Sequence, residues 1–548
     1  MKILKNIKYT TIVLVGALLF SSCEKFIEEE IFSDITSENF IDESTADQLV
    51  VGVYGEVRNS YKNYGYKFQG TDIFTNQNDV TAISASNDYV GFTAPNSNSV
   101  WSNNYSVISK ANTAINRYEN QVSWSTPKLG EKAYGIAQAR GLRALAFFNL
   151  AQQFGGVVLD LEESLAIREN YTRSTEEETY ALIISELEAA IPDLEVTPET
   201  GRFSKRAAQH LLAEVYLTRA YKSYAQSTDF ATAAALAESA IGSYDIRSQT
   251  YAEVFDFNNQ ENDEVLFAAQ WGAEGTTADK NNNKHAIFMT QVFNLVGMSR
   301  SNPYGSKSGS DMPTPYFYSL FDANDSREDV TIHRALIADE DVTGGLAPIS
   351  VGDTLVYFPK VALDAVELAD RLDRYWVYQP DQVGYGRPAD VAGTTFLYSE
   401  NTEFTNFPIF KKFDDEDFAE AGEGSRDTFI FRVAGTHLLA AEAQLGAGNA
   451  TAALTHLNRV RERATGVANH YTTVTVDNIL DERALELAGE SNRWAVLKRT
   501  GKLQERIELY NPAVVDHGAF DPNIHLLRPI PTEEFNFSPD TMTQNPGY

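Results

Sequence analysis

Apolar positions recur every three or four residues over long stretches of this chain, with polar positions between them. One such face follows Trp101 and consists of Val107, Ala111, Ala114 and Tyr118. A second periodic segment, 137–156, is rich in alanine and leucine and ends at two glycines. This spacing is typical of amphipathic helices, and a glycine after the last periodic residue is a common C-cap. Both segments are therefore predicted to be helical, as are the segments 44–54 and 174–194.

Two pairs of helices are predicted to form hairpins. The first pair covers 207–221 and 231–241, which are joined by a short polar turn. The second covers 431–464, where a Gly-Ala-Gly sequence at 446–448 separates two apolar stripes. Small residues in the stripes let two helices approach closely, as in tetratricopeptide-type hairpins. A strict period of about 34 residues is missing, so the pattern predicts a mainly α-helical scaffold of scattered hairpins rather than a regular solenoid.

The segment 256–424 has a different pattern. It contains eight of the 18 prolines, many Asn, Asp and Gly residues, and little helical periodicity. Residues 262–271 form an apolar run of strand length. We expect one domain over 44–548, in which the helical scaffold covers about 44–255 and 425–548 and a loop-rich insertion covers about 256–424. Long irregular insertions, when ordered, usually carry function.

The first 22 residues have the pattern of a signal peptide. Three lysines precede the apolar run 11–20, and two serines stand directly before Cys23, the only cysteine. The apolar run is shorter than the about 20 residues that a membrane span needs. A cysteine at the cleavage position resembles a bacterial lipoprotein signal, in which its thiol is acylated. An ordinary signal peptide with an incidental cysteine is the alternative.

Residues 23–43 are predicted to be an acidic tether. Glu24, Glu28, Glu29 and Glu30 would lie beside the lipid on Cys23. Such an acidic tract resembles the signal that sends some Gram-negative lipoproteins to the outer face of the outer membrane. A flexible solvated linker is the simpler interpretation, and the two are compatible.

Composition excludes several classes of protein. The net charge is −31, which disfavours nucleic acid as a partner because its backbone is also negative. Without a second cysteine the chain forms no internal disulfide and, once Cys23 is acylated, has no thiol for catalysis. The sequence lacks HExxH, GxSxG and phosphate-loop motifs. The segment 256–264 offers spaced oxygen donors but lacks the glycine and glutamate of a calcium loop, so a solvated turn is the better interpretation there.

Several segments together resemble the RagB/SusD family of surface lipoproteins. They are the lipobox at Cys23, "AQARGLRALAFFNLAQQFGG", "GRFSKRAAQHLLAEVYLTRA", "DERALELAGESNRW" and the terminal "TQNPGY", in the family's order along nearly the whole chain. The resemblance implies four tetratricopeptide-like units that support a loop-rich ligand-binding face with short strands.

The resemblance also implies a function. Family members capture a nutrient, most often a glycan and sometimes a peptide, as the lid of a SusC-like TonB-dependent outer-membrane transporter. They are not enzymes, and no cofactor or metal is implied. A peptide-binding member and a surface glycoside hydrolase with two carboxylates remain the alternatives, because acidic residues are abundant.

Ligand contacts in the family come from loops in two regions, which correspond here to 74–92 and 271–305. Aromatic rings cover the apolar face of a sugar, and amide and carboxylate groups bond its hydroxyls. The candidate ligand residues are Asn78, Asp79, Asn87, Asp88, Tyr89, Trp271, His285, Phe288 and Tyr304. Loop packing is an equally good interpretation of each aromatic residue. The segment 374–380 is a third candidate region that could instead face the transporter.

Charged residues in the motifs invite a catalytic interpretation. Arg140, Arg143 and the acids and bases of 480–494 are better explained as ion pairs that join helices. Trp101 and Trp494 are predicted to belong to the scaffold, since large aromatic side chains usually lie in the core.

Overall fold

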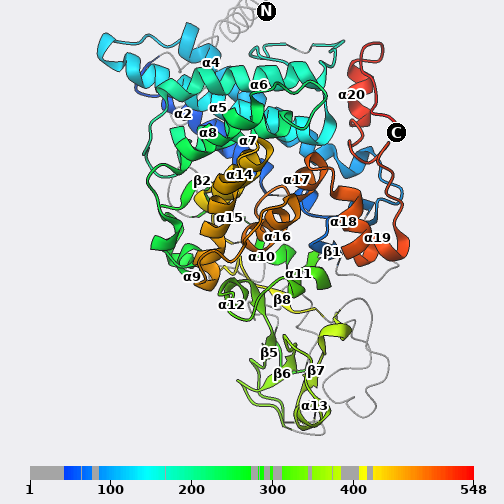
Figure 1. Ribbon diagram of the computed structural model, residues 1–548. Coiled ribbons are helices and arrows are strands. Elements are labelled where there is room, and N and C mark those ends of the chain that lie inside the picture. The colour runs from blue at the N-terminus through cyan, green and yellow to red at the C-terminus, as the bar shows by residue number, and fades with distance from the viewer. Residues whose placement is uncertain are drawn as a thin grey trace, which may run out of the picture.

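A continuous array of packed helices forms most of the structure (Figure 1). The computed structural model describes residues 42–62, 65–76, 85–166, 168–272, 282, 284–288, 296–299, 311–343, 348–372, 374–383, 407–415 and 424–548. These residues are mainly helical, as the periodicity predicts, and the strands are short.

The elements have the following bounds. The helices are α2 (Asp47–Ser60), α3 (Ala85–Asp88), α4 (Asn98–Asn120), α5 (Leu129–Phe154), α6 (Glu176–Ala190), α7 (Lys205–Arg219), α8 (Asp229–Ile241), α9 (Tyr251–Val254), α10 (Lys284–Ile287), α11 (Pro315–Ser319), α12 (Arg327–Thr331), α13 (Ala365–Leu372), α14 (Val433–Gly446), α15 (Ala450–Thr465), α16 (Val476–Leu487), α17 (Arg493–Arg499), α18 (Leu503–Tyr510), α19 (Pro512–His517) and α20 (Thr532–Phe537). The strands are β1 (Phe74–Asn76), β2 (Val265–Ala269), β3 (Asp311–Pro313), β4 (Ile332–His333), β5 (Ala335–Ile337), β6 (Thr354–Tyr357), β7 (Trp376–Val377), β8 (Ile409–Phe410) and β9 (Thr428–Arg432).

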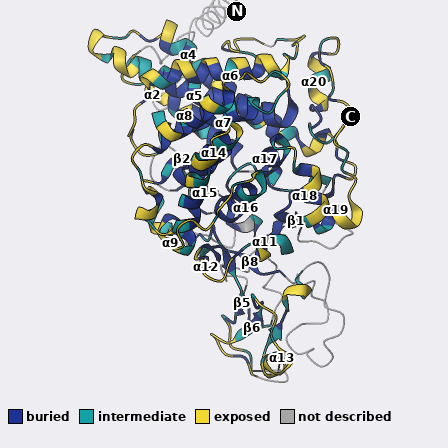
Figure 2. Ribbon diagram, viewed as in Figure 1, coloured by how far each residue is buried: buried dark blue, intermediate teal, exposed yellow. Residues whose placement is uncertain are grey.

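Each long helix packs against the next in the array. Contacts run from α2 to α4, α5, α6, α7 and α8, and α8 then packs on α14, which packs on α15 and α16. The predicted hairpins are thus α7 with α8 and α14 with α15. Helix α5 lies inside the array, and its C-terminal half is almost entirely buried (Figure 2). Helix α8 precedes the insertion in the sequence and α14 follows it, so their contact joins the two halves of the scaffold.

Local sequence signals explain where the helices begin and end. Helix α5 ends at Gly155, whose φ of 74° favours a residue without a side chain. Helix α6 begins after Thr175, which exchanges hydrogen bonds with Glu178 in a capping box. Helix α15 stops at Gly466 in the left-handed conformation. These ends agree with the predicted segments to within a few residues.

The predicted strand at 262–271 is β2, and its partner corrects one helix boundary. Strand β2 pairs antiparallel with β9, which places Val265 opposite Arg432. The helix predicted to begin at Phe431 therefore starts at Val433, because Phe431 and Arg432 belong to β9. Pairing with a segment more than 150 residues away outweighs the local helical pattern there.

Part of the insertion forms a small unit with its own core. Strands β5, β6 and β7 form one sheet, which projects with α13 from one end of the helical body (Figure 1). Its core consists of Met298, Leu336, Ala338, Ile349, Leu355, Val356, Phe358, Tyr378 and Ile409. The candidate segment 374–380 contributes β7 and this core residue Tyr378, which stacks on Phe358 with a centroid distance of 5.4 Å.

Candidate functional site

A two-stranded ribbon lies next in sequence to both predicted ligand regions. Strand β1 begins the region 74–92, and β3 follows shortly after the region 271–305. Strands β1 and β3 pair antiparallel, with Asn76 opposite Asp311. The chain therefore leaves β1 at the end of the ribbon where it enters β3. Asn78 and Asp79 follow that end, and Tyr304 precedes it by a few residues; all three lie outside the described residues. We call this end of the ribbon the β1–β3 edge.

Buried charges fix the segment that leads into the ribbon. Both carboxylate oxygens of Asp72 accept hydrogen bonds from Arg493, at 2.8 and 2.6 Å, and Arg506 donates a third at 2.7 Å. Burial raises the pKa of Asp72, but the attraction of the two guanidinium groups outweighs it and lowers the pKa below its usual value. The ribbon is thereby tied to α17 and α18.

Asn87, a predicted ligand residue, bonds the protein itself in this structure. Its Oδ1 accepts from the Gly70 amide at 3.0 Å, and its Nδ2 donates to Thr75 Oγ1 at 3.3 Å. Asn511 reinforces the same corner by donating from Nδ2 to the Thr71 carbonyl at 2.8 Å. These bonds satisfy the polar groups of the irregular segment beside β1.

Asp88 and Tyr89 also support the ribbon. The Asp88 carboxylate accepts from the Val90 amide at 2.9 Å, and burial raises its pKa. Tyr89 has a φ of 65°, donates from its hydroxyl to the Gly70 carbonyl at 2.6 Å and packs edge-on against Phe520. Both side chains are buried, so they position backbone at this face.

Phe288 lies in an aromatic cluster under β1. It is 1% exposed, and its ring centroid lies 4.7 Å from that of Phe410, 5.2 Å from Phe74 and 5.3 Å from Phe68. Such packing makes a rigid floor for the ribbon.

Trp271 and His285 are buried away from solvent as well. The Trp271 indole donates to Thr428 Oγ1 at 3.3 Å, and its backbone amide donates to Asp427 at 2.8 Å. His285 Nδ1 lies 3.7 Å from an Asp414 carboxylate oxygen. All six candidate ligand residues that the structure describes are thus buried, and ligand contact by the nine candidates stays a prediction.

The structure adds an aromatic pair that the sequence interpretation missed. Tyr316 and Tyr510 stack with centroids 3.6 Å apart and planes 11° from parallel, and both rings are half-buried. Tyr316 belongs to α11, which packs on β3, and Tyr510 ends α18, directly before the helix α19 that packs on β1. The two residues are 194 positions apart, so no local pattern links them. Helix α11 follows the end of β3 opposite the β1–β3 edge, and we treat the aromatic pair and that edge together as the candidate site.

The guanidinium group of Arg506 lies against one side of the aromatic pair. Arg506 lies 5.4 and 5.6 Å from the two ring centroids, and it bonds the Tyr316 hydroxyl at 2.6 Å. The same hydroxyl donates to Asp481 at 2.6 Å, and burial raises the pKa of Tyr316. The rings are therefore fixed before any ligand arrives, which lowers the entropy cost of binding.

Most charged residues of the motifs form ion pairs between elements, as predicted, but Arg483 does not, because its Nε and Nη1 are buried without a hydrogen-bond partner among the described residues. Arg143 bonds Glu186 across α5 and α6. Glu486 accepts from three arginines, Arg327, Arg432 and Arg463, which come from different elements. These pairs are buried, and each of them joins two elements of the scaffold.

Trp101 and Trp494 are buried in the scaffold, which confirms their predicted place. Trp101 packs edge-on against Phe154 with a centroid distance of 5.1 Å, and Trp494 is 1% exposed.

Two of the oxygen donors considered for calcium bond groups of the protein itself. Asp256 caps a short helical turn through Asn258, and Glu264 pairs with Arg432 and Arg463. In the described part of the chain, no three His, Cys, Asp or Glu side chains are grouped to hold a metal. No helix among those residues is long and apolar enough to cross a membrane.

Comparison with known proteins identifies relatives for nearly the whole chain. The model of the SusD family matches residues 263–548, and a model described as starch-binding associating with outer membrane matches residues 25–217. A SusD-like protein of Bacteroides ovatus is 27% identical over 73% of this chain and 64% of its own, so the alignment spans somewhat less than two thirds of that relative. The starch-binding protein SusD of Bacteroides thetaiotaomicron is 25% identical over 75% of this chain and 72% of its own.

Solved structures share the fold. A laminarin-binding SusD-like protein superposes with a TM-score of 0.67 at 23% identity, over 92% of this chain and all of the other. The family model alone covers more than half of the 548 residues. Motifs, helical scaffold and family model agree: the chain belongs to the SusD family.

Proposed function

We propose that this protein captures an oligo- or polysaccharide at the cell surface and delivers it to a SusC-like TonB-dependent outer-membrane transporter, for which it acts as the lid. In this proposal Cys23 is acylated and anchors the chain in the outer membrane through its lipid. Catalysis has no part in it.

The pairing of Asn76 with Asp311 supports this proposal, because both strands lie close in sequence to a candidate ligand region. Asn78 and Asp79 directly follow β1 in the sequence, and Tyr304 precedes β3 by a few residues. Amide and carboxylate groups suit sugar hydroxyls, and aromatic rings suit the C–H face of a sugar. The Tyr316–Tyr510 pair adds a preformed aromatic surface on neighbouring elements.

The names of relatives support a glycan as the ligand class. One relative is described as starch-binding and one structural neighbour as laminarin-binding. Starch and laminarin are both glucans, so glucose oligosaccharides are the first ligands to test.

Isothermal titration calorimetry against glucose oligosaccharides, other glycans and peptides tests the proposal. We expect binding to at least one glycan and its loss in the triple variant Asn78→Ala, Asp79→Ala, Tyr304→Ala. The matched control, Asn120→Ala with Asp193→Ala, changes exposed residues of the helical scaffold and retains binding. Binding to peptides alone would assign the chain to the peptide-binding branch of the family.

Incubation with the bound glycan separates capture from hydrolysis. We expect the oligosaccharide to be recovered intact by chromatography after prolonged incubation. Release of shorter sugars by purified protein would establish the glycoside hydrolase alternative. Co-purification of the full chain with an outer-membrane barrel protein tests the transporter partnership.

A further inference from the structure

A cavity lies where the C-terminal end of α5 meets α6, α7, α17 and residues of the C-terminal segment 526–545. Its volume is about 360 Å³. Pockets for small organic ligands usually measure about 300–1,000 Å³, so a compact ligand with one ring fits here. Its lining residues do not include the β1–β3 edge or the Tyr316–Tyr510 pair. The cavity is therefore separate from the candidate glycan site.

Most of the charged side chains that line this cavity are basic. Four basic groups and one carboxylate line it: Arg173, Lys222, Lys498, Arg499 and Glu176. The chain as a whole has a net charge of −31, so the cavity has the opposite sign of charge to the rest of the protein. A concave site lined by one sign of charge attracts ligands of the other sign.

Two of the four basic groups are paired with carboxylates. Lys222 Nζ lies 2.6 Å from Glu176 Oε1, so the one carboxylate of the lining is engaged. Arg499 donates to both carboxylate oxygens of Glu442, at 2.9 and 2.7 Å.

The other two basic groups, Arg173 and Lys498, form no ion pair with a carboxylate among the described residues. Both bond carbonyl groups at the same end of α5. Arg173 Nη2 donates to the Phe154 carbonyl at 3.0 Å, and Lys498 Nζ donates to the Gln152 carbonyl. Because these carbonyls are two residues apart, both basic groups lie at one side of the cavity. The C-terminus of a helix carries only about half an elementary negative charge, so it offsets only part of two cations.

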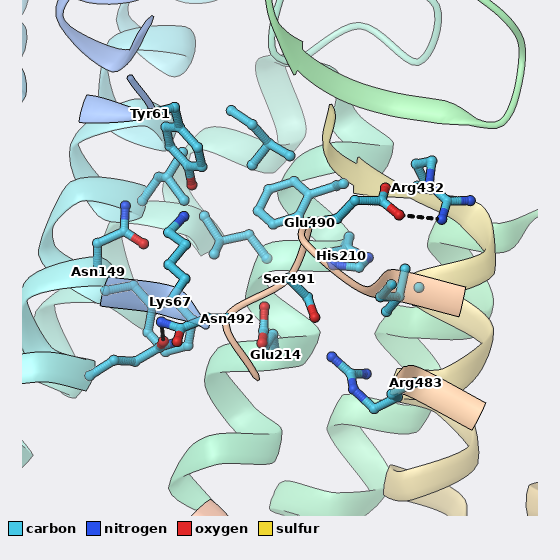
Figure 3. Close-up of a pocket in the computed structure, with 18 residues that line it drawn as sticks. Tyr61, Lys67, Asn149, His210, Glu214, Arg432, Arg483, Glu490, Ser491 and Asn492 are labelled. Carbon is cyan, nitrogen blue, oxygen red and sulfur yellow. Dashed lines mark hydrogen bonds and ion pairs between the residues drawn. The ribbon is translucent and has the colours of Figure 1, made fainter. Parts of the chain in front are cut away.

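A smaller cavity provides a contrast. Its volume is about 60 Å³, which is too small for an organic ligand, and Lys67, Arg483 and Glu214 are among the residues that line it. Figure 3 shows the Glu214 carboxylate between the two basic side chains. The protein thus supplies its own counter-charge in the smaller cavity.

Apolar groups complete the lining of the larger cavity. Ala495 of α17 and the neighbouring Leu526 and Leu527 all line it. Thr218 and Asn545 add neutral polar groups. A ligand that combines an anionic group with a compact organic body matches this lining better than an inorganic ion does.

We propose that this cavity binds a small organic carboxylate. The carboxylate group lies on the side of Arg173 and Lys498, and the body of the ligand packs against Ala495, Leu526 and Leu527. A uronic acid and an N-acylated amino acid share this chemistry, and the experiment below distinguishes them. The site is independent of the glycan-binding proposal.

The electrostatics of Lys498 agree with this ligand class. Burial lowers the pKa of Lys498 well below its usual value, and the charges of Lys222 and Arg528 lower it further, whereas Glu176 opposes them. A carboxylate beside the ammonium favours its protonated form. Binding of the ligand and protonation of Lys498 therefore stabilise each other.

Isothermal titration calorimetry with the full mature chain tests the proposal. Glucuronate is compared with glucose, and N-acetylleucine with its neutral amide, all at equal ionic strength. We expect at least one acid to bind about tenfold more tightly than its neutral counterpart, because charge-assisted hydrogen bonds are stronger than neutral ones. The acid that binds identifies the source of the ligand as a sugar or an acylated amino acid.

Variants assign the binding to this cavity. Lys498→Met and Arg173→Met should each weaken binding of the acid about tenfold. The matched control Lys110→Met removes an exposed lysine from α4 and should retain it. The triple variant of Asn78, Asp79 and Tyr304 should also retain it, which separates this site from the glycan site.

Each outcome decides the question. Equal affinities for acid and neutral counterpart, no binding of either acid at millimolar concentration, or affinity that survives both cavity variants would overturn the proposal. If neither variant folds, crystals of the unmodified chain soaked in para-bromobenzoate give the answer. An anomalous bromine peak inside the cavity is expected, and the absence of a peak there would refute the site.

Discussion

Replacing Glu486 tests whether the charged residues of segment 480–494 stabilise the fold. Its side chain is fully buried, with Oε1 accepting from Arg432 at 3.1 Å and from Arg463, and Oε2 accepting from Arg327 at 3.2 Å. The three arginines come from β9, α15 and α12. Replacing Glu486 by glutamine keeps the shape and removes the charge that all three share.

The expected loss of stability follows from burial. Breaking a buried ion pair by removing one partner costs about 3–5 kcal/mol, because the remaining charges stay buried. The pKa of Glu486 gives a second route to this magnitude. Burial raises that pKa, but Arg463, Arg432 and Arg327 outweigh it and lower the pKa from 4.5 to about 2. This lowering is equivalent to about 3 kcal/mol of stability at neutral pH.

The lowered pKa of Glu486 also predicts how its contribution to the unfolding free energy changes with pH. The carboxylate binds its proton at lower pH in the folded than in the unfolded state. Its contribution is therefore complete above about pH 4.5 and is lost as the pH falls towards 2. Between pH 7 and pH 3 the difference in unfolding free energy between the unmodified chain and Glu486→Gln should shrink by about 2 kcal/mol.

Urea unfolding followed by far-ultraviolet circular dichroism measures both effects. Glu462→Gln is the control, because Glu462 pairs with Arg247 at the surface at 3.2 Å and such pairs contribute at most about 1 kcal/mol. A loss below 1 kcal/mol for Glu486→Gln, or a difference that stays constant down to pH 3, would refute the reasoning.

Three further predictions concern binding, the core and the anchor. Tyr510→Ala should weaken glycan binding about 3- to 10-fold in calorimetry, whereas Leu509→Ala, at a neighbouring exposed position, should not. If Tyr510→Ala bound the glycan as tightly as the unmodified chain, the aromatic pair would not belong to the site. Phe288→Ala should lower the unfolding free energy by about 3–5 kcal/mol in urea titrations, and a stable variant that loses only binding would make Phe288 a ligand residue. Cys23→Ser should abolish fatty-acid labelling and move the protein to the aqueous phase of a detergent partition, and a labelled variant would exclude this anchor.

The helical scaffold was accessible from the sequence because its signals are local. Apolar stripes at helical spacing predicted α7, α8, α14 and α15, and Gly155 marked the end of α5. Each of these signals acts within a few turns of one helix. The strand β2 was likewise visible as a short apolar run, although its partner β9 was not.

The candidate site could be predicted only as two regions. Asn87 looks like a ligand residue in a polar loop, yet its partners include Gly70 and Thr75, and Asn511 reaches the same corner from 424 positions away. Phe288 looks equally available, but its ring packs under β1 against Phe410. The sequence shows that a side chain is polar or aromatic. It does not show which distant residue that side chain contacts in the folded protein.

The sequence by itself determined the helical class, the family and the candidate anchor, because periodicity, motif order and a lone cysteine are properties of short segments. Tertiary structure alone decided that β1 pairs with β3, that Tyr316 stacks on Tyr510 and that Asp72 pairs with Arg493. These contacts join residues hundreds of positions apart. They arise only when the folded chain brings its distant segments together, so no local pattern contains them.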